Sequence, residues 1–141
     1  MQQTLYGYNI YNNNSKITIA TDIGHIDENL FNHFKDSSFI MLESNYEPNI
    51  LKFSSYPYKL KQRIASKNGH LSNGEAGDTI SKLINHGLKD VLLIHLSKEN
   101  NVPEIAYQSV VEKLHNNNIS LNNINLNVAP RDNPSKIFDI I

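Results

Sequence analysis

Four polar residues of the types that bind metal ions or transfer protons stand where predicted elements end or begin. Asp22, Glu43 and His95 each follow a short apolar run of strand character, and His70 lies just before the predicted N-terminus of a helix. In open α/β sheets, reactive groups gather where strands end and loops begin. The wide separations match no short metal-binding motif, so the pattern alone predicts an α/β domain with a metal or phosphate site.

Asp22 and His95 carry donor atoms that suit a divalent cation. Both oxygens of a carboxylate can ligate, so Asp22 suits a bridge between two ions; the alternative is an aspartate that caps the following turn. A neutral imidazole at position 95 would be a further ligand, oriented by an acceptor behind it. The alternative for His95 is a hydrogen-bonded histidine of the core.

His70 and Ser72 lie beside a helix N-terminus, where the helix dipole and free N–H groups attract an anion such as phosphate. A histidine there can donate a proton to a leaving oxygen, and Ser72 is a candidate substrate contact. Glu43 would pair with the imidazole and hold its charged form. The alternatives are a loop histidine in solvent and a solvated glutamate at a strand end.

Lys61 and Arg63 belong to a basic cluster that begins at Lys59. Such a cluster forms either a solvated helix face or a contact with a phosphate backbone. Over the whole chain, 14 acidic residues face 13 Lys and Arg, for a net charge of −1. This balance gives no footprint for nucleic acid or an anionic membrane beyond a local patch.

The strands and helices that position these residues alternate along the chain. Apolar and β-branched runs predict strands at 4–11, 16–20, 38–42, 90–96 and 124–128. Helical periodicity and capping residues predict a short helix after Asp27, helical pieces within 45–66, a helix from 73, and a helix from Pro103 that turns Ile105, Ala106, Val110 and Leu114 inward. The order β-β-α-β-α-α-β-α-β predicts one α/β layered domain over residues 1–141.

The composition excludes several classes of protein. The chain has no Cys, which excludes disulfides, thiolate zinc sites and cysteine nucleophiles. The N-terminal residues lack the pattern of a signal peptide, and the longest apolar runs are only as long as a strand. We therefore expect a cytoplasmic protein without a membrane span. The many Asn residues are expected mainly on the surface.

Five segments occur in one order and together resemble the C-terminal half of the WalJ/YycJ-type hydrolases of the metallo-β-lactamase fold. The segments are Thr21-Asp22-Ile23-Gly24, Leu42-Glu43-Ser44-Asn45, Leu60-Lys61-Gln62-Arg63-Ile64, Gly69-His70-Leu71-Ser72-Asn73 and, most specific, His95-Leu96-Ser97-Lys98-Glu99-Asn100-Asn101-Val102-Pro103-Glu104. The resemblance spans nearly the whole chain and extends in layout to ribonuclease Z. It implies half of a four-layer αββα sandwich, without its N-terminal half.

The resemblance also implies a cytoplasmic metal-dependent phosphodiesterase with exonuclease activity, on DNA rather than RNA. Asp22 matches the aspartate that bridges two metal ions, and His95 matches the last histidine ligand of the second ion. His70 matches the histidine that assists the leaving group or binds the scissile phosphate, and Glu43 matches the glutamate that orients it. The superfamily uses a metal-bridging hydroxide as nucleophile, and Zn²⁺ and Mn²⁺ both suit such ligands.

Two departures from the family pattern bear on activity. The signature His-x-His-x-Asp-His is absent from the sequence, and Tyr46 stands where the family has a histidine. Catalytic zinc sites normally use three or more protein ligands, so we expect this chain alone to hold no metal and to be inactive. Its open sheet face favours the missing N-terminal half or self-association.

An alternative from another functional class stays open: the chain is a non-catalytic interaction module derived from the same fold. Superfamily hydrolases that act on thioesters or lactams are a weaker alternative, because His70 and Ser72 beside a helix N-terminus favour phosphate. Arg63 and Lys61 are the candidate contacts to the substrate backbone.

Overall fold

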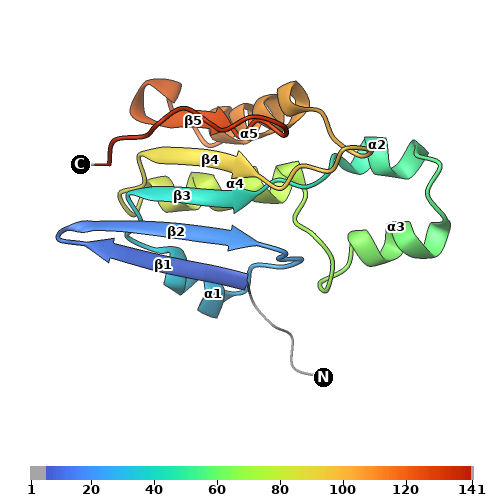
Figure 1. The fold of residues 1–141 in the computed structure, drawn as a ribbon, viewed down its shortest axis with the longest axis horizontal. Coiled ribbons are helices and arrows are strands. Elements are labelled where there is room, and N and C mark those ends of the chain that lie inside the picture. The colour runs from blue at the N-terminus through green and yellow to red at the C-terminus, as the bar shows by residue number, and fades with distance from the viewer. Residues whose placement is uncertain (1–5, 141) are drawn as a thin grey trace.

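The computed structural model describes residues 6–140 and contains a five-stranded sheet whose strands lie side by side in chain order (Figure 1). The first two strands pair antiparallel, and all later neighbours pair parallel. The strands are β1 (Tyr6–Asn12), β2 (Ser15–Thr21), β3 (Phe39–Glu43), β4 (Asp90–Ile94) and β5 (Asn125–Val128). The predicted alternation of strands and helices is confirmed over the described residues, except that three helices rather than two lie between β3 and β4, and a short 3-10 helix, Leu121–Asn123, precedes β5. Residues 4 and 5 of the predicted first strand lie outside them.

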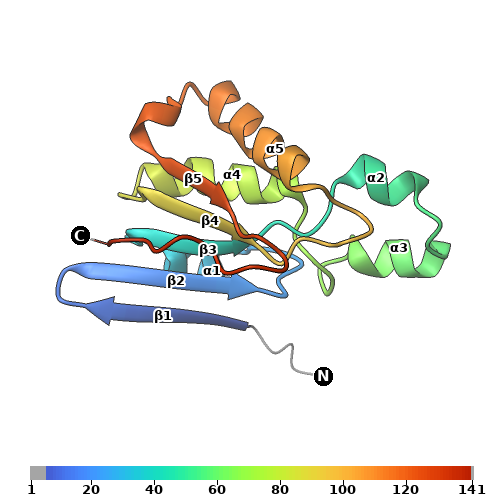
Figure 2. The ribbon, with the colours of Figure 1, turned by 45° about the horizontal axis from the view of Figure 1, so that its top comes forward.

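Three helices pack on one face of the sheet: α1 (Glu28–Phe34), α4 (Asn73–Ile84) and α5 (Pro103–Asn116) (Figure 2). Their apolar stripes and the inward strand residues form one core, which includes Phe34, Leu42, Ile80, Leu93 and Val110. Local sequence fixes the helix starts, as predicted. Asp27 accepts from Leu30 N at 2.8 Å, and Pro103 occupies the first turn of α5.

One residue predicted to face the core lies at its edge. Ala106, Val110 and Leu114 are fully buried at spacings of four residues, whereas Ile105 is 37% exposed. A single helical stripe with this spacing leaves the residue one step earlier on the flank of the helix. The inward prediction for Ile105 is therefore wrong, and those for the other three residues are confirmed.

The opposite face of the sheet has much lighter cover. The chain after β5 runs back across it (Figure 2), and the Phe138 ring contacts the Phe39 ring with centroids 5.1 Å apart. Along the β1–β2 hairpin this face is open: Tyr8 and Ile10, which pair with Ile19 and Ile17, are 65% and 51% exposed. The described residues thus form a mixed α/β unit with one sheet.

Two short helices, α2 (Pro48–Phe53) and α3 (Tyr58–Ile64), project beyond the carboxyl ends of β3 and β4 (Figure 1). Pro48 lies in the first turn of α2, and Pro57 immediately precedes α3. No residue of α3 is buried. No helix among the described residues has the length and apolar character to cross a membrane.

Candidate metal centre

The four residues singled out by their types meet at one edge of the sheet. Asp22 follows β2, Glu43 ends β3 and His95 follows β4, while His70 lies on the loop before α4. Because β2, β3 and β4 are parallel neighbours, their carboxyl ends adjoin, and the loop before α4 passes the same edge. One donor atom from each of the four side chains lies within 4.8 Å of the others. This group could hold a metal ion.

Glu43 connects the two histidines of the centre through hydrogen bonds. Its side chain is fully buried, and its Oε1 accepts hydrogen bonds from Nδ1 of His70 and Nδ1 of His95, each at 2.7 Å. Its Oε2 accepts from the backbone N–H groups of Ile23 at 3.0 Å and Leu71 at 3.3 Å. Four N–H donors thus satisfy both oxygens of one buried carboxylate, as a buried charge requires.

The charge of Glu43 fixes the proton positions on the two imidazoles. Burial raises the pKa of Glu43, but the hydrogen bonds from His70, His95 and Ile23 together lower that pKa below its ordinary value. An ionised carboxylate only accepts hydrogen bonds, so both Nδ1 atoms carry protons. Each Nε2 is then left to bind a cation or to exchange a proton.

Glu43 is therefore a positioning residue, because both of its oxygens are already engaged. Asp22 is the exposed carboxylate of the centre. Its Oδ1 lies 3.8 Å from His70 Nδ1 and 3.7 Å from His95 Nδ1. The hydrogen bond to Glu43 raises the pKa of His95 most; burial opposes this rise, and the charges of Glu43 and Asp22 add to it. Metal-binding histidines characteristically donate their second N–H to a carboxylate in this way.

Asp22 and His95 share an uncommon backbone conformation, with φ of 56° and 58°. Non-glycine residues seldom adopt this left-handed conformation, although Asp and His tolerate it better than most. The side-chain amide of Asn45 donates to the backbone oxygen of His95 at 2.8 Å, which holds the turn after β4. The left-handed conformation turns the backbone at the end of each strand. The side chains of Asp22 and His95 therefore lie over the edge of the sheet, whereas in a regular strand each would lie on one face.

A buried polar network fixes the loops that carry these residues. Asn73 accepts from Ser44 Oγ at 2.6 Å and exchanges hydrogen bonds with Asn101 at 2.9 Å. Asn101 also donates to the backbone oxygen of Ser44. The network joins the loop after β3, the start of α4 and the loop after β4. Asn45, Asn73, Asn100 and Asn101 are all buried, so the prediction that asparagines lie mainly on the surface is wrong for these four.

Comparison with known proteins shows that the chain is similar to part of two proteins named as nucleases. Over 107 residues the chain is 34% identical to a Bacillus anthracis protein named exodeoxyribonuclease YycJ and 32% identical to exodeoxyribonuclease WalJ of Streptococcus pneumoniae serotype 2. The chain matches one part of the YycJ/WalJ exodeoxyribonucleases. The matched region is 76% of this chain and only 40% of each relative. The predicted resemblance to this group is confirmed; no protein-family model matches the chain.

Cations and hydroxyl groups near the centre are the predicted contacts to a phosphate group, because phosphates are anionic. Lys61 directs its ammonium group inward, to the backbone oxygens of Lys52 at 2.8 Å and Ser54 at 2.7 Å. Arg63 is exposed on α3. Ser72 forms a capping box with Glu75 and is buried. The substrate roles of these residues stay predictions.

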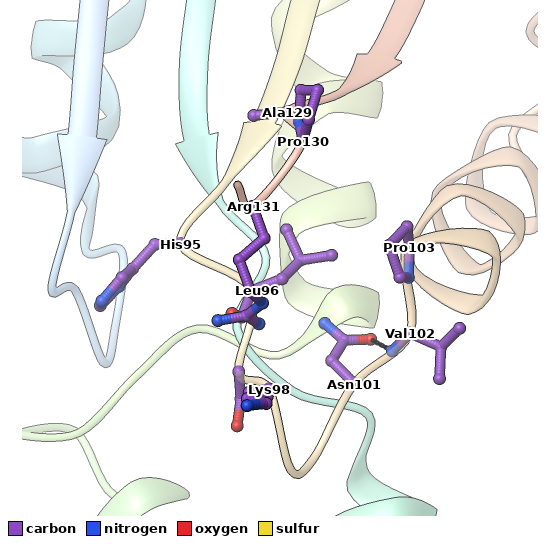
Figure 3. Close-up of a pocket in the computed structure, with 10 residues that line it drawn as sticks. His95, Leu96, Lys98, Asn101, Val102, Pro103, Ala129, Pro130 and Arg131 are labelled. Carbon is purple, nitrogen blue, oxygen red and sulfur yellow. Dashed lines mark hydrogen bonds between the residues drawn. The ribbon is translucent and has the colours of Figure 1, made fainter. Parts of the chain in front are cut away.

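Two further cations that sequence reasoning missed, Lys98 and Arg131, lie beside the centre. Together with His70 and His95 they line a cleft of about 430 Å³, and an adjoining pocket of about 360 Å³ continues past His95 (Figure 3). Arg131 donates to the backbone oxygen of Leu96 at 2.8 Å, which holds its guanidinium across the loop after β4. The sequence hint was slight: Arg131 is one of only two arginines in the chain.

Proposed function

We propose that this chain is the part of a metal-dependent phosphodiesterase that carries Asp22, Glu43, His70 and His95, and that the complete enzyme is a DNA exonuclease. The observation that carries the proposal is the shared hydrogen bonding of Glu43, which gives two imidazoles the same tautomer and gathers both rings at the carboxylate of Asp22, whose Oδ1 lies 3.8 Å from His70 Nδ1 and 3.7 Å from His95 Nδ1. The names of the relatives supply the substrate class, DNA.

The donor set fits two divalent cations of the Zn²⁺ or Mn²⁺ kind. Asp22 offers carboxylate oxygens and His95 offers Nε2, and both ions accept such ligands. Cations held there would supply a water-derived nucleophile at neutral pH and would neutralise charge that develops on the phosphate. Glu43 keeps the His95 ring in the orientation that this binding needs.

His70 is the proposed proton donor to the leaving oxygen, or the group that binds the scissile phosphate. Its Nδ1 is fixed on Glu43, so its Nε2 is the atom that would face the substrate. It lies just before α4, a helix of 12 residues whose N-terminal dipole favours an anion. The neighbouring Ser72 is the proposed further substrate contact.

We further propose that the centre is completed by another polypeptide segment. Asp22 and His95 are two ligands, and catalytic zinc sites normally use three or more from the protein. The chain spans 40% of the length of the curated relatives it matches, so those relatives hold additional residues that can supply ligands. The open sheet face around Tyr8 and Ile10 is the proposed surface for that segment or for a second copy.

The proposal is tested by measuring bound metal and nuclease activity of the purified 141-residue chain, alone and mixed with the remaining portion of a relative. We expect little metal and no cleavage alone, and metal with cleavage after mixing. Asp22→Asn should abolish the gained activity, whereas Asp132→Asn, on an exposed residue of the C-terminal segment, should retain it. Two bound metals with activity in the chain alone would overturn the proposed incompleteness.

A non-catalytic interaction module is the second candidate function, favoured by the open apolar surface at Tyr8 and Ile10. Absence of metal binding and of cleavage in the mixture, together with stable self-association, would favour this module over the enzyme.

A further inference from the structure

One stretch of the chain is basic without any acidic residue. Between Glu47 and Glu75 there is no Asp or Glu, although the whole chain has 14 acidic residues. Five of the 13 Lys and Arg residues fall there: Lys52, Lys59, Lys61, Arg63 and Lys67. We call residues 48–67, which contain α2 and α3, the arm. The arm is therefore a local basic patch, although the positive and negative charges of the whole chain nearly balance.

Large aromatic side chains stand exposed among these cations. Phe53 at the end of α2 is 81% exposed, and Tyr58 at the start of α3 is 73% exposed. Lys52 Nζ lies 5.5 Å from the centroid of the Phe53 ring. Aromatic rings interleaved with cations are the surface on which proteins bind single-stranded nucleic acid, because bases stack on the rings and phosphates pair with the cations.

The arm is continuous with the candidate metal centre. The cleft of about 430 Å³ that contains His70 and His95 is walled on the arm side by Tyr56, Leu60 and Ile64. A second cavity of about 460 Å³ lies between α2 and α3, and Tyr56 lines this cavity too. Tyr56 thus belongs to the lining of both cavities, which brings the arm next to the cleft at His70 and His95.

The far wall of the cleft is also suited to a nucleotide. Lys98 and Arg131 bring positive charge to the cleft that His95 also lines. Asn100 lines the same wall, and its buried Oδ1 has no hydrogen-bond partner among the described residues. A buried carbonyl oxygen without a partner is costly, so the side chain of Asn100 has an unmet acceptor at this wall.

We propose that the arm is a binding platform for single-stranded nucleic acid that guides one strand into the cleft at His70 and His95. Bases stack on Phe53 and Tyr58, while Lys59 and Arg63 bind phosphates. The platform selects a single strand over a duplex because the bases of a duplex are already stacked on one another. The inference deepens the proposed function, on which it rests for the class of ligand.

The test measures binding rather than cleavage, so that it does not depend on the metal. The fluorescence anisotropy of a short labelled single-stranded DNA is followed as the 141-residue chain is added, at low salt and with EDTA. A blunt duplex and a single-stranded RNA of the same length are measured in parallel. We expect the single strands to bind and the duplex to bind at least tenfold more weakly.

Variants of exposed residues locate the platform. Phe53→Ala and Tyr58→Ala should each weaken binding about 5- to 150-fold, the range for loss of one stacked base. Lys59→Ala and Arg63→Ala should each lower the slope of log affinity against log salt by about 0.7, the value for one phosphate contact on a single strand. Tyr11→Ala on β1 and Lys82→Ala on α4 are the matched controls, since Tyr11 is 68% exposed and Lys82 is exposed.

Each outcome decides the proposal. Equal binding of the duplex, no binding of any single strand, or equal losses in the control variants would overturn the platform. Cross-linking of a bromouracil-containing single strand to peptides of the arm would support it, and cross-linking only outside residues 48–67 would refute it. Binding without cleavage in the mixing experiment would leave the platform supported and the proposed enzyme refuted, so the two failures are distinguishable.

Discussion

Glu43 Oε1 lies 2.7 Å from His95 Nδ1, and the same oxygen accepts from His70 at the same distance. One fully buried atom thus orients two imidazoles that are 25 positions apart in the sequence. The centre is consequently organised around one carboxylate, both of whose oxygens already accept hydrogen bonds.

Replacement of Glu43 by Gln should destabilise the chain. The amide nitrogen of Gln donates where the carboxylate accepts, so at least one buried N–H group loses its partner. We expect the free energy of unfolding to fall by about 1–3 kcal/mol. Urea denaturation in the presence of EDTA measures this change. Glu104→Gln, on the exposed first turn of α5, is the control and should change the value by less than about 0.5 kcal/mol.

Asn73 should prove to be a structural residue of the same kind. It is fully buried and connects Ser44, Glu47 and Asn101. Asn73→Ala leaves several of these groups without a partner, and we expect a loss of roughly 2–4 kcal/mol in the free energy of unfolding. Asn122→Ala, at an exposed site, should be close to neutral. Equal stabilities of the two variants would show that the network contributes nothing.

The sequence predicted the alternation of strands and helices, and the meeting of three polar residues at one sheet edge, for a local reason. Strands, caps and breakers are set by neighbouring residues, and parallel strands carry whatever follows them to one edge. Asp22, Glu43 and His95 therefore met where their places after apolar runs indicated. The shared contact of Glu43 with both histidines could not be predicted, since it depends on the relative rotation of three strand ends.

The residues that sequence reasoning missed depend on contacts between distant segments. Arg131 comes from the chain after β5 and reaches the loop after β4. The buried asparagines looked like members of an abundant surface type, and only the packing of three loops distinguishes Asn73 and Asn101 from the others. Neither feature has a periodicity that marks it in the sequence.

Tyr46 should make the stability of the chain depend on pH in the alkaline range. Burial, followed by the charges of Glu75 and Glu43, raises the pKa of Tyr46 to about 12, from about 10 in the unfolded chain. The folded state holds the proton more tightly, so the contribution is fully present below about pH 10. It is lost as the pH rises towards 12, and amounts to about 2–3 kcal/mol.

Tyr46→Phe isolates this contribution from other groups that titrate in the same range. The difference in free energy of unfolding between the natural chain and the variant should be constant below about pH 10 and should decline above it. Urea denaturation at a series of pH values measures the difference. Parallel curves throughout the alkaline range would contradict the prediction.

Substitutions of Ser72 distinguish its structural role in the capping box from its proposed role in substrate binding. Its Oγ accepts from Glu75 N at 3.2 Å, and Glu75 Oε2 accepts from Ser72 N at 2.9 Å. Ser72→Ala should lower the free energy of unfolding by about 1 kcal/mol, whereas Ser72→Thr keeps a capping hydroxyl and should lose less. Thermal denaturation compares the two. A rise in KM for DNA in the reconstituted nuclease with Ser72→Ala, restored by Ser72→Thr, would add the predicted substrate contact.

Ile10 tests the open face of the sheet as an association surface. It is 51% exposed, and its cross-strand partner Ile17 lies on the face away from the helices. Exposed apolar strands at a sheet edge promote association, and a lysine there opposes it. Ile10→Lys should therefore reduce self-association, or binding of the remaining portion of a relative, by at least tenfold in sedimentation equilibrium. Asn12→Lys at the end of the same strand is the control, and equal effects of both substitutions would indicate that charge alone, rather than the apolar face, governs association.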